Sequence, residues 1–147
     1  MAVPVSQSYV ESTVRIQPSQ ANNYDNTHGG EVVRMMDELA AISAMRVAKE
    51  TCVTASIGSV DFRVPIPVGH VAELAAFAYD TGRTSIQVSV EVDARDPRED
   101  AVERTTSARF TMVAVDEDGS PVEVPDVVAE SERCEELLTT VDADQSK

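Results

Sequence analysis

The sequence predicts an α+β fold in which one antiparallel sheet covers a single long helix. Residues 31–49 form a mostly apolar helical pattern, four strand-like segments follow in a row, and one more strand precedes the helix. A lone helix followed by consecutive strands favours an antiparallel sheet packed on that helix. With 147 residues the chain is long enough for one domain with a substantial core, which we place at residues 1–125.

The segment before the helix is expected to contain one strand. Residues 1–7 are predicted to be disordered. Apolar and polar residues alternate from Tyr9 to Ile16, which is typical of a half-buried strand. Residues 17–27 form a predicted polar loop, and the helix runs from Glu31 to about Lys49.

Four strands are predicted after the helix, at about 51–63, 70–81, 83–93 and 103–116. These segments are rich in alternating and β-branched residues, and turn residues separate them. After Pro125 the chain becomes an acidic tail, residues 126–147, with a predicted short helix around 130–138 that frays toward its end.

The composition excludes several classes of function. The formal charge is −14, from 26 acidic and 12 basic residues, so the chain should bind neither nucleic acid nor anionic membranes. No run of about 18 apolar residues is present, so no membrane span is expected. The two cysteines and two histidines have no metal-binding spacing, which predicts no metal and a cytoplasmic protein with free thiols. High acidity with only two lysines, Lys49 and Lys147, predicts a halophilic source.

One carboxylate departs from the charged face of the predicted helix. At about 100° per residue, five charged side chains share one arc, and Asp37 lies about 120° from the centre of that arc. The five are Glu31, Arg34, Glu38, Arg46 and Lys49. A carboxylate among apolar neighbours can act as a general base. A solvated position on the flank of the helix is the alternative, and periodicity alone does not separate the two.

The polar loop from Asn22 onward ends in two glycines, Gly29 and Gly30, at the start of the helix. The first N–H groups of a helix lack partners within it, and the helix dipole there favours negative charge. We therefore expect these amides to stabilise a developing oxyanion while Asp37 activates water. His28 is a candidate base, but it is expected to position the loop or shape the pocket.

The turn formed by Gly82, Arg83, Thr84 and Ser85 is a second candidate site. An arginine fork, two hydroxyl donors and a glycine that permits close approach suit a phosphate group. An ordinary hairpin turn is the alternative interpretation.

Together these segments resemble the hotdog-fold acyl-CoA thioesterases, and in particular the cytosolic acyl-CoA hydrolases of the bacterial short-chain and brain types. The resemblance runs from about Asn22 to Pro125. Its motifs are Asn22 with His28-Gly29-Gly30, Met36-Asp37-Glu38, residues 53–57 with 60–62, Gly82 to Ser85, and residues 111–116 with Gly119. It implies a hotdog fold, that is, a five-stranded antiparallel sheet wrapped around one long central helix. It also implies homodimers, often assembled into trimers of dimers, which are hexamers.

The resemblance further implies hydrolysis of an acyl-CoA to a free acid and CoA, without a bound cofactor. Asn22 and Asp37 match the catalytic pair of the family, whose members come from different subunits, and Gly30 or the amide beside it matches the oxyanion donor. The turn from Gly82 to Ser85 matches the region that holds the CoA nucleotide. Thr54 and Phe62, with His28, are expected in the pocket. The family often has glycine where this chain has Asp25, so the loop is expected to differ in shape.

Two questions stay open at the level of sequence. Asp37 is expected either to abstract a proton from water or to attack the thioester directly, and the sequence does not separate these routes. The alternative function is a non-catalytic, acyl-CoA-binding regulatory module of the same fold. An apolar setting for Asp37 beside an intact Asn22 favours the enzyme, because a sensor needs no base.

Overall fold

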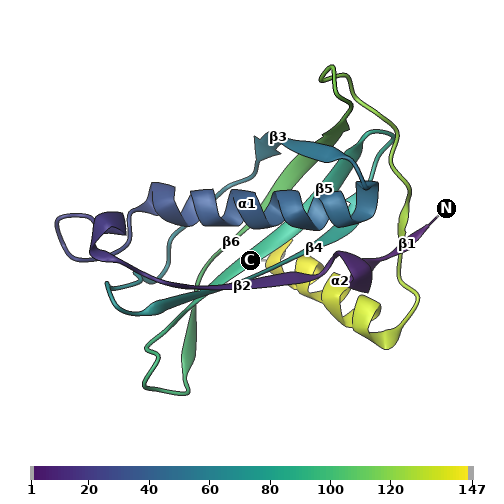
Figure 1. Cartoon of the computed structure of the whole chain (residues 1–147). Coiled ribbons are helices and arrows are strands. Elements are labelled where there is room, and N and C mark those ends of the chain that lie inside the picture. The colour runs from purple at the N-terminus through teal and green to yellow at the C-terminus, as the bar shows by residue number, and fades with distance from the viewer. Residues whose placement is uncertain (1, 146–147) are drawn as a thin grey trace.

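A computed structural model describes residues 2–145, with side chains up to residue 141 (Figure 1). In chain order the elements are β1 (Val3–Pro4), the 3₁₀ helix η1 (Val5–Ser8), β2 (Val10–Arg15), the 3₁₀ helix η2 (Pro18–Gln20), α1 (Gly29–Ala48), β3 (Thr51–Ile57), β4 (Val71–Thr81), β5 (Ser85–Arg95), β6 (Val102–Val115), β7 (Val127–Val128) and α2 (Glu132–Gln145).

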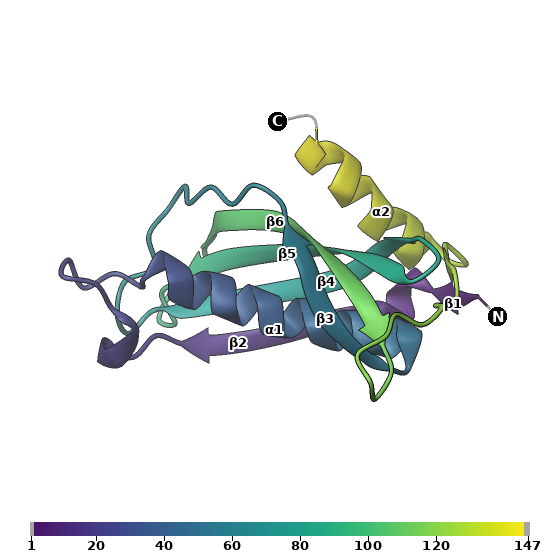
Figure 2. The ribbon, with the colours of Figure 1, turned by 90° about the horizontal axis from the view of Figure 1, so that it is seen from above.

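Five strands form one sheet in the order β2-β4-β5-β6-β3, and every pairing in it is antiparallel. Helix α1 has 20 residues, about 30 Å at 1.5 Å per residue, and it lies along one face of this sheet (Figures 1 and 2). The predicted hotdog architecture is therefore confirmed.

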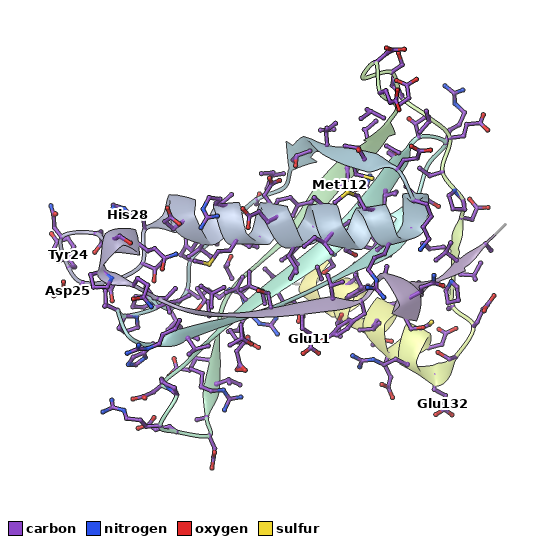
Figure 3. The ribbon with its side chains drawn as sticks, in the orientation of Figure 1. Glu11, Tyr24, Asp25, His28, Met112 and Glu132 are labelled. Atoms are coloured by element: carbon purple, nitrogen blue, oxygen red, sulfur yellow. The ribbon has the colours of Figure 1, made fainter. Side chains whose placement is uncertain are left out.

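Period-two patterning explains how the sheet and the helix share one core. Ile86, Val88, Val90 and Val92 of β5 are fully buried, because alternate residues of a strand point to the same face. They pack in one cluster with the inward side of α1, which includes Met36, Ala40 and Ala44. Met112 of β6 lies in the same layer between helix and sheet (Figure 3).

The opposite face of the sheet is covered at one end by α2. Cys134, Leu137 and Val141 of α2 form a second buried cluster with Val5 of η1 and Phe77 of β4. Successive side chains of a strand point to opposite faces of the sheet. Ala76 and Ala78 of β4 point toward α1, so Phe77 between them packs on the opposite face, in this second cluster. Figure 2 shows α1 and α2 on opposite sides of the sheet.

Three predictions about the ends of elements are wrong. The expected disorder of residues 1–7 fails for residues 3–7, because Val3 and Val5 are buried and β1 pairs in parallel with β7. β3 ends at Ile57 instead of residue 63, and residues 58–70 form a loop. Helix α2 extends from Glu132 to Gln145, past the predicted end near residue 138, and it packs on the sheet.

Candidate active site

Asp37 lies on the side of α1 that faces the edge strand β3. The hydroxyl of Thr54 donates a hydrogen bond to Oδ1 of Asp37. Asp37 itself is half-buried, whereas Glu38 beside it is exposed and pairs with Arg34 at 3.0 Å. Asp37 is therefore held by a side chain of the sheet and is not a freely solvated carboxylate.

The strand that carries Thr54 is open to solvent on both faces. Of the seven residues of β3, Cys52 alone is buried within the described chain, and Val53 and Ile57 are among the exposed large apolar side chains. β3 also ends the sheet, so its outer backbone groups face no neighbouring strand of the described chain. An open apolar edge of this kind is a surface for pairing with a second chain.

Asn22 closes its own loop at the other end of the site. Its side-chain Oδ1 accepts hydrogen bonds from the N–H groups of Tyr24 at 2.8 Å and Asn26 at 3.2 Å. Because the oxygen is committed to the loop, the amide nitrogen is the part of the side chain that can donate to a ligand. Asp25 adopts a left-handed φ of 60°, the conformation that glycine adopts most easily and that aspartate tolerates better than most residues.

Helix α1 begins at Gly29 with its first amides available. The N-cap residue, His28, makes no side-chain capping hydrogen bond. Within residues 2–145, the backbone N–H groups of Gly29 and Gly30 donate no hydrogen bond. The ring of Phe62 packs directly on Gly29, where an added Cβ would lie 3.2 Å from it. Gly29 thus allows Phe62 to close against the helix start, and the space beside Gly30 is open.

A cleft of about 300 Å³ lies beside this helix start. It brings together three of the predicted residues, Asn22, Gly29 and Phe62. The remaining lining residues are Asn26, Thr27, Val32, Arg63, Val64, Pro65, Ile66 and Thr105. His28 is exposed and, like Thr54, does not line the cleft within the single chain, so the assignment of both to the substrate pocket stays a prediction.

The turn from Gly82 to Ser85 lies at the other end of the molecule (Figures 1 and 2). The carbonyl of Thr84 accepts a hydrogen bond from the N–H of Ala114, which pairs with Cys52 just after the end of α1. An added Cβ at Gly82 would lie 2.7 Å from Oγ of Ser85, so the Ser85 side chain would have to rotate away. Arg83 is highly exposed and reaches Glu123 only at 4.0 Å. Within a single chain, the predicted nucleotide site is therefore far from the cleft.

Two parts of the cleft were missed by the sequence analysis. Residues 58–63, which the sequence predicts as the end of a strand, belong to a loop that walls the cleft. Thr105 was treated as an ordinary strand residue. The signal that could have singled it out is the pair Thr105-Thr106, which precedes the apolar alternation of Ala108, Phe110 and Met112 on β6.

No helix in the part of the chain that the structure describes combines the length and apolar character needed to cross a membrane. The described residues also contain no group of three or more His, Cys, Asp or Glu side chains placed to hold a metal ion.

Comparison with known proteins places the chain in a family. A model of the thioesterase superfamily matches residues 24–101, more than half of the chain. The chain belongs to the thioesterase superfamily. Among the relatives in this superfamily, an uncharacterized acyl-CoA thioester hydrolase of Bacillus subtilis, YkhA, is 36% identical over 132 residues, which cover 90% of this chain and 76% of that protein. Protein VdlD of Helicobacter pylori is 36% identical over 110 residues. That match covers 75% of this chain but only 63% of VdlD.

Solved structures of thioesterases match nearly the whole chain. An apo-hexameric acyl-CoA thioesterase superposes with a TM-score of 0.88 at 38% identity, covering 99% of this chain and 94% of that one. The acyl-CoA hydrolase of Staphylococcus aureus, solved with butyryl-CoA, CoA and CoA disulfide, gives a TM-score of 0.87 at 29% identity, with 97% and 87% covered. Further structures of that enzyme carry alanine in place of an asparagine, an aspartate or a threonine.

Proposed function

We propose that this chain hydrolyses acyl-CoA thioesters to a free carboxylic acid and CoA. The observation that carries the proposal is the carboxylate of Asp37, held by the Thr54 hydroxyl at an open sheet edge. A thioesterase needs a base or nucleophile that is fixed in place and can reach a substrate, and this pair meets both conditions. The names of the relatives, acyl-CoA thioester hydrolases, support the same substrate class.

The spacing of the candidate residues gives independent support. The asparagine, aspartate and threonine that were replaced by alanine in the S. aureus hydrolase lie at the same spacing along that chain as Asn22, Asp37 and Thr54 lie here. Three residue types in one order at matching intervals favour a shared arrangement of all three.

The groups of the protein suffice for the chemistry. Asp37 takes a proton from water, and the water oxygen bonds to the thioester carbonyl carbon. The carbonyl oxygen becomes an oxyanion, which accepts hydrogen bonds from the amides of Gly29 and Gly30 at the positive end of α1. The carbon–sulfur bond then breaks, and the CoA thiolate takes up the proton. Direct attack by Asp37, with a transient anhydride that water cleaves, is the second route open to the same residues.

The working site is proposed to combine two chains. Asp37 lies seven residues after Gly30, about 10 Å along α1, and it does not line the cleft of Asn22 and Gly29. A second chain related by a two-fold axis, paired through the exposed β3 edges, would bring its Asp37 to this cleft. Three such dimers would form a hexamer, the assembly named for the apo-hexameric relative.

The same pairing is proposed to complete the CoA site. The turn from Gly82 to Ser85 lies beside the end of α1, whereas the cleft lies at its start. Antiparallel helices across a two-fold axis would bring the end of one near the start of the other. Arg83 would then hold a CoA phosphate, and Arg63 in the wall of the cleft adds a second positive charge.

Replacing Asp37 tests the proposal. We expect the native chain to release CoA thiol from short acyl-CoAs in an assay with a thiol reagent, and Asp37→Asn to lower kcat by about 10² to 10⁴, the usual range for loss of a general base. Glu38→Gln is the matched control, because Glu38 is an exposed carboxylate on the same helix and should leave kcat unchanged. Binding of acyl-CoA without hydrolysis would favour the regulatory module instead. Full activity in Asp37→Asn would remove Asp37 from the mechanism.

A further inference from the structure

Two adjacent hydroxyl groups are buried on β6 without a hydrogen-bond partner. Thr105 and Thr106 are 1% and 0% exposed, and Oγ1 of each finds no partner among the described residues. A buried hydroxyl without a partner costs free energy, and nearly all buried polar groups in proteins are paired. Of the two, Thr105 lines the cleft, so its hydroxyl indicates a polar partner there that the described residues do not supply.

A β-bulge places Thr105 at this point. Thr106 pairs with Val92 and Arg104 pairs with Asp93, so Thr105 is an extra residue between two successive pairs of β5 and β6. Bulges commonly redirect a side chain next to an active site. The carbonyl of Thr105 accepts a hydrogen bond from the N–H of Arg63 at 2.9 Å, which ties the bulge to the loop that walls the cleft. With that carbonyl engaged, the hydroxyl is the side-chain polar group that Thr105 can offer to a ligand.

Thr105 shares the cleft with five apolar side chains. Thr105 lines it together with Asn22 and Gly29, where the thioester would be held. The apolar part of the lining consists of Val32, Phe62, Val64, Pro65 and Ile66. Asn26, Thr27 and Arg63 also line the cleft, and the hydroxyl of Thr27 already donates to the carbonyl of Ile66. An acyl group that extends from the thioester into this cleft would therefore meet apolar walls and, at Thr105, a buried hydroxyl without a partner. At about 300 Å³ the cleft is at the small end for a ligand site, which suits a short acyl group.

We infer that the cleft selects short acyl groups that carry a hydrogen-bonding oxygen, a hydroxyl or a ketone, over plain hydrocarbon acyl groups of the same length. The inference rests on the proposed function and adds a substrate class to it. A hydrocarbon chain would leave the Thr105 hydroxyl buried and unpaired, whereas an oxygen on the acyl chain would pair with it. Sites built to hydrogen-bond a substrate group discriminate strongly against the analogue that lacks it.

The experiment compares kcat/KM for 3-hydroxybutyryl-CoA and butyryl-CoA, which differ by one oxygen, in the full chain. We expect the native protein to prefer the hydroxylated substrate by about tenfold or more. Thr105→Val, which keeps the shape but removes the hydroxyl, should bring the ratio close to one, mainly through a loss on the hydroxylated substrate. Thr105→Ser should restore the preference. Thr111→Val on the same strand is the matched control, because its hydroxyl bonds to Gln87 at 2.9 Å and does not line the cleft.

The outcomes separate this inference from the proposed function. Asp37-dependent hydrolysis of both substrates with a native ratio near or below one would overturn the inference and leave the proposed function intact. A native preference that persists in Thr105→Val would also overturn it, because the discrimination would then come from elsewhere. Absence of hydrolysis of every acyl-CoA would overturn both.

Discussion

Asp37 is the residue on which the proposed chemistry depends, and Thr54 fixes where its carboxylate points. The two side chains come from different layers, α1 and the edge strand β3, so the hydrogen bond between them couples the position of the base to the position of the strand. A carboxylate on a helix flank can rotate among several conformers, and a hydroxyl donor selects one of them. Thr54 is therefore a positioning residue rather than a group that reacts.

Removing this hydroxyl should lower kcat more than it changes KM. A hydrogen bond to a charged group contributes about 1.5–3 kcal/mol, so we expect Thr54→Val to lower kcat by about 10- to 100-fold. Thr54→Ser keeps the donor and should recover most of the rate. Steady-state kinetics on butyryl-CoA would measure both changes. A loss in Thr54→Ser together with an unchanged rate in Thr54→Val would show that the methyl group, and not the hydroxyl, is what the site requires.

Among the elements, those with a strong local pattern could be predicted from the sequence. Helix α1 and the strands β2, β4, β5 and β6 each show a regular spacing of apolar residues within their own sequence, so no other segment is needed to recognise them. The phase of Asp37 on the helix could likewise be calculated, because it depends only on spacing. The partner Thr54 could be named from the family resemblance, but its contact with Asp37 depends on how β3 is placed across the helix.

The elements that failed to be predicted depend on distant partners. η1 and β1 are buried only because residues 126–128 and α2 return to cover them. The predicted strand at 51–63 pairs with β6 only as far as Ile57. Beyond it, the N–H groups of Gly58 and Arg63 still donate to β6, to the carbonyls of Arg109 and of Thr105 in the bulge. The bulge is a property of two paired strands, so one strand's sequence does not specify it.

Helix α2 should dock more firmly in mildly alkaline solution. Burial opposes ionisation of the Cys134 thiol, but hydrogen bonds from Ser131 and Ser6 favour the thiolate, and the pKa is lowered from 9.0 to about 7. A pKa that is lower in the docked state than in the undocked state adds stability as pH rises between these two values. Hydrogen-exchange protection of α2 amides should therefore increase from pH 7 to pH 9.

Cys134→Ser gives the control for this pH dependence. Serine keeps a small polar side chain but does not ionise in this range, so protection of α2 in the variant should be the same at pH 7 and pH 9. The other cysteine, Cys52, should not ionise between pH 7 and pH 9, because burial and the nearby Glu50 raise its pKa to about 11. An unchanged pH dependence in Cys134→Ser would assign the effect to another group.

At the scale of the whole molecule, local charge matters more for substrate binding than net charge. The chain carries −14, and CoA is itself an anion, so long-range repulsion opposes binding. Two arginines of the sheet are already matched by acids: Arg95 pairs with Glu73, and Arg104 with Glu91 and Asp93. Arg63 lines the cleft and Arg83 stands at the exposed turn, where either can meet a phosphate.

A site shared between chains makes a prediction that no single-chain site makes. Asn22→Ala and Asp37→Ala chains should each be inactive alone, but a dimer of one of each retains one intact site, formed by Asn22 of one chain and Asp37 of the other. Random assembly after co-expression should recover about a quarter of native activity, because about half of the dimers are mixed and each has one of two sites.

As a control, Asn22→Ala chains assembled with chains that carry both substitutions should recover nothing. No recovery in the first mixture, with mixed dimers shown by two affinity tags, would place Asn22 and Asp37 in the same chain's site. The 10 Å of helix between Gly30 and Asp37 would then have to be bridged by a bend in α1 or by the substrate itself.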